Sequence, residues 1–383
     1  MSKVAVVRCT NYEYAEVRRA VERGVLLLGG TELFVQRGEH LLLKPNLLSA
    51  TAPEKCVTTH PAVFKAVAEV LLSAGVSLSY GDSPAFVSMQ SAARKSGIAR
   101  VAEELGIAPA DFKTGVDIYF DEGRQNRKFV IAGDVLKSIG IISIPKFKTH
   151  GLERITGCIK NQFGCIPGIL KGEYHVKIPD ANDFARMLVD LNRLVHPRLY
   201  VLDAIRAMEG NGPNSGTPRQ MNMLLLSDDP VALDATACRT IALNPEYVPT
   251  IRYGSECGLG TYDEADIELA GDPLDEFRTE DFDVDRTPVT PYRATGLTRF
   301  ISNTVVPKPL ILKERCVRCG VCIDMCPARP KALHWVDGGH SHPPAYNYHK
   351  CIRRYCCQEV CPQQSAIILK LPLMRSLLGP LLT

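Results

Sequence analysis

The sequence CVRCGVCIDMCP at residues 316–327 sets four cysteines in the order C-x2-C-x2-C-x3-C, followed by proline. This run is typical of bacterial-type ferredoxins, where a tight turn presents three thiolates to one [4Fe–4S] cluster and the fourth reaches a neighbouring cluster. A zinc knuckle usually shows two separate C-x-x-C pairs instead. The spacing therefore predicts an iron–sulfur module near the C-terminus and, with it, a redox protein.

A second cysteine group follows as Cys351-x4-Cys356-Cys357-x3-Cys361, again with a proline after the last cysteine. Counting back from Cys361 at ferredoxin spacing gives positions 357, 354 and 351, and position 354 is an arginine. Similar pairs follow the two runs, Ala332-Leu333 and Ala366-Ile367. The pattern indicates a duplicated half-ferredoxin with one irregular half.

In a two-cluster module the last cysteine of each run ligates the cluster of the other run. One cluster would then take Cys316, Cys319, Cys322 and Cys361. The other would take Cys326, Cys351 and Cys357, with Cys356 as fourth ligand if the loop bends. A three-iron cluster on three cysteines, a module with a single cluster, or a second cluster with an unusual ligand remains open. Arg354 is no ligand, because a guanidinium stays protonated and only donates hydrogen bonds.

Basic residues surround the cysteines. They are Arg315, Arg318, Arg329, Lys331, Lys350, Arg353 and Arg354. They form either an ordinary solvated surface or a docking face for an acidic electron carrier, such as ferredoxin or flavodoxin, because a patch of one charge steers an oppositely charged partner. A partner redox enzyme is the other candidate for that face.

The length of 383 residues suits one large domain and a small module. A net charge of +3, with no basic stripe carrying interleaved aromatics, argues against a nucleic-acid partner. The N-terminus shows no signal-peptide pattern, and no stretch approaches the roughly 20 apolar residues of a membrane span. Because iron–sulfur chemistry and free thiols fit a reducing compartment, we expect a cytoplasmic protein.

Strand-like and helix-like stretches alternate along the first 270 residues. The expected strands are 4–7, 40–44, 76–80, 139–144, 199–202 and 223–226; the expected helices are 14–28, 61–74, 89–105 and 231–243. Such alternation predicts an α/β layered fold around a mostly parallel sheet. The predicted organisation is an α/β domain at 1–272, a Pro-rich linker at 273–313, a ferredoxin-like α+β module at 314–370 and an apolar tail at 371–383 that packs against the body.

Lysines, histidines and amides gather where the expected strands end, and ligands of open α/β sheets bind beyond the carboxyl ends of strands. We expect a pocket for an anionic carboxylate or phosphate ligand there. Its candidate binding residues are Lys44, Asn46, Asp82, Lys160 and Asn161. Its candidate catalytic residues are Lys146, Lys148, His60, His150 and His175, a histidine being the expected proton donor.

Two further cysteines, Cys158 and Cys165, flank Lys160 and Asn161. They are either extra cluster ligands or a redox pair, or simply small buried side chains, which is the commoner role of free cysteine. No G-x-G-x-x-G motif opens a helix after a strand, and no Walker-type phosphate loop is present. A nicotinamide or flavin bound in the Rossmann manner is therefore not expected.

Taken in order, these motifs resemble the family named domain of unknown function 362, which is often joined to a ferredoxin-type module. The motifs that carry the resemblance are KPNL at 44–47, THP at 59–61, GDSP at 81–84, PKFKTH at 145–150, TG at 156–157, KNxxG at 160–164, EGxGP at 209–213, DPVA at 229–232 and YCCQEVCP at 355–362. In the family the position of Arg354 is commonly a cysteine. Cys356 is therefore the candidate to supply the ligand that this cysteine would provide. The family has no single general activity, so the resemblance implies the architecture and the clusters rather than a reaction.

Three functions remain open. The first is a ferredoxin-linked reductase, in which one or two [4Fe–4S] clusters pass electrons to an anionic small molecule in the α/β domain. The second is an electron-transfer subunit that docks a partner enzyme and has no substrate of its own. The third is a regulator that uses a cluster as a redox or iron sensor.

Overall fold

The structure is a computed structural model that describes residues 1–84, 87–178, 180–289, 307–363 and 365–370. The predicted apolar tail at 371–383 lies outside these ranges, as does the part of the predicted linker at 290–306. Within the described ranges, no helix combines the length and the apolar character that crossing a bilayer requires.

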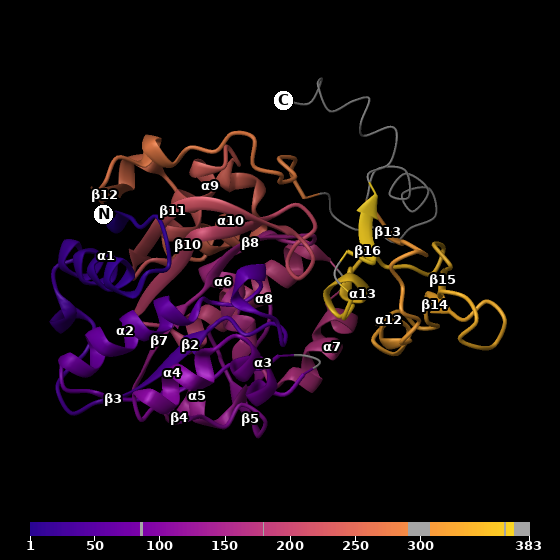
Figure 1. Ribbon diagram of the computed structural model, residues 1–383, viewed down its shortest axis with the longest axis horizontal. Helices are drawn as coiled ribbons and strands as arrows, with labels where there is room; N and C mark the ends of the chain where they lie inside the picture. The colour runs from indigo at the N-terminus through magenta and orange to yellow at the C-terminus, as the bar shows by residue number, and fades with distance from the viewer. Residues whose placement is uncertain (85–86, 179, 290–306, 364, 371–383) are drawn as a thin grey trace.

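A mixed sheet of ten strands forms the centre of the large domain (Figure 1). Its main path runs in the order β12 (Ile267–Gly271), β1 (Ser2–Arg8), β11 (Thr217–Ser227), β10 (Leu199–Glu209), β7 (Gly140–Ile144), β2 (His40–Pro45), β3 (Ser77–Tyr80) and β4 (Ala108–Pro109). From β10 to β4 every neighbouring pair is parallel, and only β11 runs antiparallel to both of its neighbours. The predicted α/β fold with a mostly parallel sheet is confirmed.

Helices cover the sheet, which explains why its central strands read as continuous apolar runs. Leu41–Leu43 and Leu224–Leu226 are fully inaccessible to solvent, as expected for strands that are buried on both faces. Helix α1 (Tyr14–Leu27) packs with α2 (Pro61–Ser73), and α8 (Ala181–Val195) and α9 (Pro230–Thr240) both pack with α10 (Pro249–Glu256). Burial of these apolar faces is the main force that stabilises the domain.

Two local expectations need correction. Residues 89–105, predicted as one helix, form α3 (Met89–Lys95) and α4 (Ile98–Glu104), because Gly97 takes a left-handed φ of 82° between them. The residues after Pro145, expected as a strand end, form β8 (Lys146–His150), which pairs with β10 and with β9 (Arg154–Thr156). The lysines and the histidine of this segment therefore project from a strand rather than from a loop.

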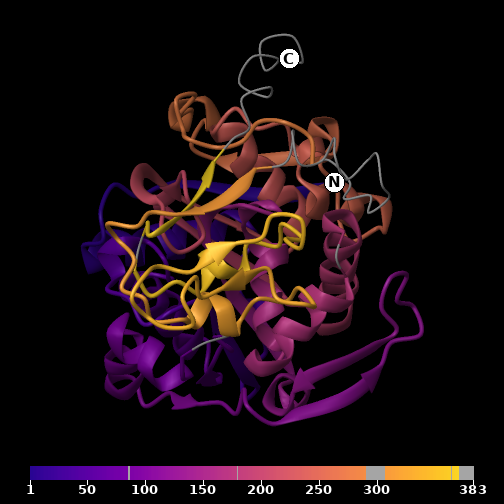
Figure 2. The same ribbon diagram turned by 90° about the vertical axis from the view of Figure 1, so that its right-hand side faces the viewer.

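The cysteine-rich module stands beside the sheet, in orange and yellow in Figures 1 and 2. It contains α12 (Val321–Asp324), α13 (Cys356–Glu359) and two short antiparallel pairs, β14 (Leu333–His334) with β15 (Ala345–Tyr346) and β13 (Lys308–Ile311) with β16 (Ile367–Lys370). Strand β13 comes from the stretch that the sequence assigned to the linker.

The loop between β10 and β11 holds the module against the large domain. Gln358 Nε2 donates to the side-chain and main-chain oxygens of Asn211, at 2.7 and 3.0 Å, and to Gly212 O at 3.0 Å. Asn211 Nδ2 donates in turn to Ile367 O at 2.9 Å. The EGxGP motif at 209–213, for which the sequence suggested no separate role, therefore positions the module.

Candidate active site between the sheet and the cysteine module

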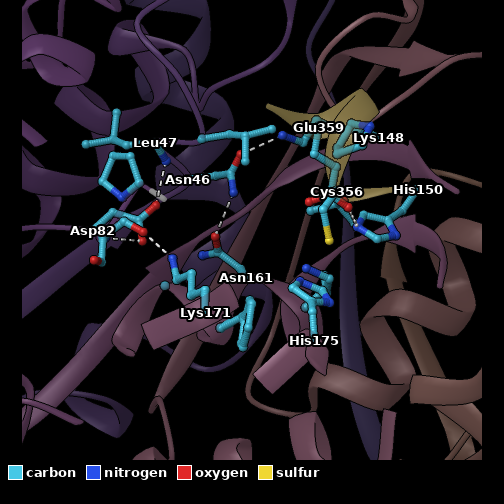
Figure 3. A pocket seen from close by; sticks show the side chains of 18 of the residues that line it. Asn46, Leu47, Asp82, Lys148, His150, Asn161, Lys171, His175, Cys356 and Glu359 are labelled. Carbon is cyan, nitrogen blue, oxygen red and sulfur yellow. Dashed lines mark hydrogen bonds and ion pairs between the residues drawn. The ribbon is translucent and has the colours of Figure 1, made fainter. Parts of the chain in front are cut away.

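A cavity of about 790 Å³, counted to its open mouth, lies where β2, β3 and β8 end and the module begins (Figure 3). Seven of the ten predicted pocket residues line it: Asn46, Asp82, Lys148, His150, Lys160, Asn161 and His175. The module contributes Met325, Cys356 and Glu359 to the same cavity. One pocket thus joins the polar strand ends of the α/β domain to the cysteine-bearing part of the chain.

Helix α6 (Cys158–Asn161) presents two of these side chains, Lys160 and Asn161. The carboxylate of buried Asp234 anchors the start of the helix, accepting from Cys158 N at 2.7 Å and from Ile159 N at 3.2 Å. Any side chain on Gly157 would collide with this carboxylate, because an added Cβ would lie 2.1 Å from Asp234 Oδ1. The glycine of the TG motif is therefore required for this arrangement.

The main-chain N–H groups that follow β8 determine which ring nitrogen of neutral His150 carries the proton. Its Nδ1 accepts hydrogen bonds from Leu152 N and Glu153 N, both at 3.1 Å, so in the neutral ring Nε2 carries the proton. Nε2 lies 3.1 Å from Glu359 Oε1, although the two groups are not aligned for a regular hydrogen bond. Burial lowers the pKa of His150 below its ordinary value. The imidazole is therefore neutral and directs an N–H toward the module.

Glu359 is the acidic partner on the module side. Burial opposes its ionisation, but the interaction with His150 and the charge of Lys160 outweigh burial and lower the pKa of Glu359 to about 2. The pocket therefore contains a permanent carboxylate at the edge formed by α13.

Three lysines give the cavity its positive charge. Lys148 Nζ donates to Asn46 Oδ1 at 2.9 Å and to Val57 O at 2.6 Å; burial, reinforced by the charge of Lys160, lowers its pKa to about 7. Lys171 donates to Ser83 O, and burial lowers its pKa to about 8. In the described part of the chain Lys160 Nζ has no hydrogen bond or ion pair, and it lies 5.0 Å from the centre of the Phe163 ring. This ammonium is available to a bound anion.

Lys44 does not line the cavity but supports its floor. It is fully buried and pairs through Nζ with Asp82 Oδ1 at 3.0 Å, while Asp82 Oδ2 accepts from Leu47 N at 2.6 Å. An added Cβ on Gly164 would lie 1.8 Å from Asp82 Oδ1. The glycine of the KNxxG motif therefore makes room for this ion pair.

The two amides, Asn46 and Asn161, link the strand ends to α6. Asn46 Nδ2 donates to Asn161 Oδ1 at 3.1 Å, and Asn161 Nδ2 donates to Lys44 O at 3.3 Å and to Ser143 Oγ at 3.0 Å. Most of their hydrogen-bonding capacity is thus used within the protein. They position the neighbouring lysines and have little left for a ligand.

His175 enters the cavity from α7 (Gly168–Lys177). Its ring stacks on Phe184 with 4.6 Å between ring centres, and burial lowers its pKa to about 3. Its Nδ1 has no hydrogen-bond partner in the described part of the chain, and neither has the buried Oγ1 of Thr156, another lining residue. Polar atoms that are buried without partners are costly unless a ligand or water satisfies them.

Two predicted catalytic residues, Lys146 and His60, lie outside the cavity. Lys146 Nζ bonds Asp203 Oδ2 at 2.9 Å and Tyr12 OH at 2.8 Å. The His60 ring stacks on Tyr12 at 3.6 Å, and its Nδ1 accepts from Ala62 N at the start of α2. The register of β8 on β10 shifts between Lys146 and Lys148, so the two lysines reach different surroundings. Both residues act in packing and capping rather than in the pocket.

Four module cysteines, Cys316, Cys319, Cys322 and Cys361, line a second, smaller cavity. Left-handed backbone at Arg318 (φ 57°) and Gly320 (φ 78°) wraps the first run around it. Among the described residues, no group of three His, Cys, Asp or Glu side chains is placed to hold a single metal ion. The four thiols instead line the wall of a small cavity. Four free thiols around one small space fit the donor set of a [4Fe–4S] cluster.

The second cysteine set is divided between two small hydrophobic clusters of the module. Cys326 and Cys351 pack in one small cluster, Cys326 Sγ accepts from Ala332 N at 3.3 Å, and Cys357 Sγ accepts from Tyr346 OH at 3.1 Å. Cys356 instead points into the pocket (Figure 3). Met325 and Cys356, both lining the pocket, directly precede two cysteines of this set. The cavity therefore adjoins the second set.

Cys158 and Cys165 are fully buried in the core of the large domain. Burial raises the pKa of both thiols, to about 12 for Cys165 and well above the ordinary value for Cys158. Both are therefore protonated, inert core residues rather than a redox pair.

Together, the α/β domain and the cysteine geometry define an iron–sulfur electron-transfer protein. Residues 309–330 match the 4Fe-4S binding domain, and residues 41–239 match the family described as Domain of unknown function (DUF362). The chain belongs to this DUF362 family. The expectation that rested on the motifs is thereby confirmed.

The chain is also similar to individual proteins. A thylakoid-associated protein from Synechocystis sp. is 34% identical over 260 residues, which is 68% of this chain and 80% of that protein. One component of an ion-translocating oxidoreductase complex from Edwardsiella ictaluri is 33% identical over 94 residues, 24% of this chain and 11% of that component. The lactate racemase apoprotein from Thermoanaerobacterium thermosaccharolyticum aligns with a TM-score of 0.40 and 13% identity over 63% of this chain and 57% of that one. This last likeness is too weak to carry an argument.

Sequence reasoning missed three important pocket residues, Lys171, Met325 and Glu359. Lys171 directly precedes Gly172, close to His175, so its place in the same helix was a usable signal. Met325 and Glu359 carried no such signal, because their contribution depends on how the module docks.

Proposed function

We propose that this protein is a ferredoxin-linked reductase that passes electrons from its module to an anionic small molecule in the pocket. The module would hold one [4Fe–4S] cluster on Cys316, Cys319, Cys322 and Cys361, and a second cluster at Cys326, Cys351 and Cys357. The observation that carries the proposal is the shared cavity: lysines and histidines of the α/β domain and side chains beside the second cysteine set line one space. The clusters supply single electrons when they are bound.

The lysines bind and orient the anion. Lys160, which has no anionic partner in the described structure, provides the main attraction, and Lys171 adds to it from the opposite helix, α7. Asp82 is neutralised by Lys44 and therefore repels the ligand little. An anion in a partly buried site interacts with such ammonium groups far more strongly than it would in bulk water.

Lys148 is the best candidate for the proton donor. A general acid works best when its pKa lies near the working pH, and burial brings that of Lys148 to about 7. His150 and His175 are neutral at that pH, so each can donate a hydrogen bond to the ligand but would have to form an imidazolate to give up a proton. The histidine expected to protonate the substrate is thus better assigned to orienting it.

Electrons would reach the module at the first cluster site. Cys319 is exposed, and Lys313, Arg315 and Arg318 around it are exposed as well. Against one exposed acid, Glu314, these three cations leave the surface over the more exposed cluster basic, which suits an acidic carrier such as ferredoxin or flavodoxin in a reducing, cytoplasmic setting. The same surface suits the alternative function, an electron-transfer subunit that docks a partner enzyme, which the similarity to the oxidoreductase component favours.

The test is reoxidation of dithionite-reduced, cluster-loaded protein by small carboxylates, followed through the cluster absorbance. The panel would hold pyruvate, fumarate and crotonate, which offer a carbonyl or a polarised double bond. We expect at least one to reoxidise the clusters, and the variant Lys160→Gln to slow that reaction at least tenfold. The matched control Lys95→Gln removes an exposed lysine outside the cavity and should change nothing. If none of the acids is reduced while an acidic flavodoxin exchanges electrons rapidly, the electron-transfer subunit replaces the reductase.

A further inference from the structure

The two cysteine runs fold as copies of one another at a constant offset of 35 residues. Arg318 and Gly320 have left-handed backbone in the first run, with φ of 57° and 78°. Their counterparts 35 residues later, Arg353 and Tyr355, have φ of 55° and 57°. In both runs the second of these residues is the N-cap that directly precedes a one-turn helix, α12 or α13. The backbone conformations of the two runs are therefore more alike than their cysteine spacings suggest.

This register assigns every cysteine of the second run. Cys351, Cys357 and Cys361 correspond to Cys316, Cys322 and Cys326, all of them predicted ligands. Arg354 takes the place of Cys319, and Cys356 takes the place of Val321, which is no ligand. A loop bent to bring Cys356 into the vacant position would break this correspondence.

The side chain of Cys356, in addition, lies in other surroundings than those of a cluster ligand. It lies on the face of α13 that lines the substrate pocket, with its Sγ 3.7 Å from Arg354 O. Cys357, the next residue, points instead to Tyr346 at 3.1 Å. Adjacent residues of a helix face directions about 100° apart, and the two thiols accordingly have different surroundings in this structure.

Arg354 does not fill the place of the missing thiolate either. Its side chain is buried, and its Nε has no hydrogen-bond partner in the described part of the chain. The groups that interact electrostatically with its guanidinium are first Cys356, then Glu153 and Asp180 of the α/β domain. A guanidinium has no lone pair to offer iron. The second site therefore has three thiolates and one corner without a protein ligand.

We propose that Cys326, Cys351 and Cys357 alone hold the second cluster, and that this cluster is stable as [3Fe–4S] once oxidised. Ferricyanide takes one electron from a [4Fe–4S] cluster, and the iron at the corner without a thiolate then leaves as Fe²⁺, which balances charge and atoms. The inference rests on the second cluster of the proposed function, but not on the substrate pocket.

The experiment measures iron and acid-labile sulfide per chain, with EPR of the oxidised protein, after brief ferricyanide treatment and desalting. The wild-type protein should retain about seven irons and show the signal of an oxidised three-iron cluster, since oxidised [4Fe–4S]²⁺ is EPR-silent. The variant Arg354→Cys should retain about eight irons and lose the signal. Arg354→Ala removes the same arginine without supplying a thiol and should behave like the wild type, as should Cys356→Ser.

Each other outcome overturns the inference. About eight irons and no signal in the wild type would mean that a fourth ligand exists, and a three-iron signal that arises only in Cys356→Ser would identify that ligand as Cys356. About four irons in the wild type would mean that the second cluster is absent, which also removes it from the proposed function. If Arg354→Cys does not fold, the wild-type iron count and the Cys356→Ser spectrum still decide the question.

Discussion

Anion binding in the pocket should weaken as the pH rises from 6 to 8, because Lys148 loses its proton in that range. Its pKa is lowered by burial to about 7, whereas burial lowers the pKa of His150 below its ordinary value and that of His175 to about 3. The charge of the pocket therefore changes at the lysines, and it becomes less positive with rising pH.

The size of the effect follows from the protonated fractions. A group with a pKa of about 7 is roughly 90% protonated at pH 6 and roughly 10% at pH 8, so an anion that binds only the ammonium form loses about tenfold in affinity, or about 1.4 kcal/mol. Lys171, with a pKa of about 8, is about half deprotonated at pH 8 and adds about a further twofold. The expected total for the wild-type protein is thus about 20-fold.

Isothermal titration with sulfate at constant ionic strength measures this directly, because the charge of sulfate does not change between pH 6 and 8. In Lys148→Gln only the roughly twofold effect of Lys171 should remain. Lys148→Arg, which stays charged throughout, should bind sulfate with the same weak pH dependence, and Lys95→Gln should match the wild type. A 20-fold fall that persists in Lys148→Gln, or wild-type binding that does not vary with pH, would refute the assignment of Lys148.

Three further outcomes test the surrounding structure. Asp82→Asn leaves the buried Lys44 without its partner and should cost about 3–5 kcal/mol in urea unfolding, against under about 1 kcal/mol for Asp117→Asn in an exposed ion pair. Burial raises the pKa of Glu153 from 4.5 to about 8, so between these pH values the folded state keeps a proton that the unfolded state loses. The stability of the wild-type protein should therefore fall as the pH rises through this range, and the Tm of Glu153→Gln should fall less. Cys361→Ser, although in the second run, leaves the first site with three thiolates and should make the first cluster lose about one further iron per chain on ferricyanide treatment; a change confined to the second site would contradict the cavity geometry.

Much of this arrangement followed from local sequence patterns. The strands that are buried on both faces are continuous apolar runs, so the parallel part of the sheet was predictable. The cysteine spacing predicted Cys316, Cys319 and Cys322 in the small module cavity because their geometry is local, and Cys361 because two-cluster modules exchange the last cysteine of each run. The polar strand ends likewise predicted Asn46, Asp82, Lys148 and His150, since parallel strands bring their carboxyl ends to one edge, while Lys160, Asn161 and His175 reach the pocket from α6 and α7.

The remaining features depend on contacts that are distant in sequence. Lys146 and Lys148 are two residues apart in one motif, yet a shift of register on β10 sends Lys146 to Asp203 and Lys148 to Asn46. The docking of the module brings Glu359 to His150, more than two hundred residues away in the sequence. Neither periodicity nor motif spacing contains this information.

Helix α13 is the element in which the redox and binding properties of the protein meet. Within one turn, Cys357 faces Tyr346 inside the module, Cys356 faces the pocket, and Glu359 lies against His150. When an electron reaches a cluster on Cys357, negative charge increases beside the lysines of the pocket, and that charge acts on them through a poorly solvated interior. Reduction of the cluster should therefore raise the pKa of Lys148 and favour its protonated form, so the arriving electron would itself help to load the proton donor.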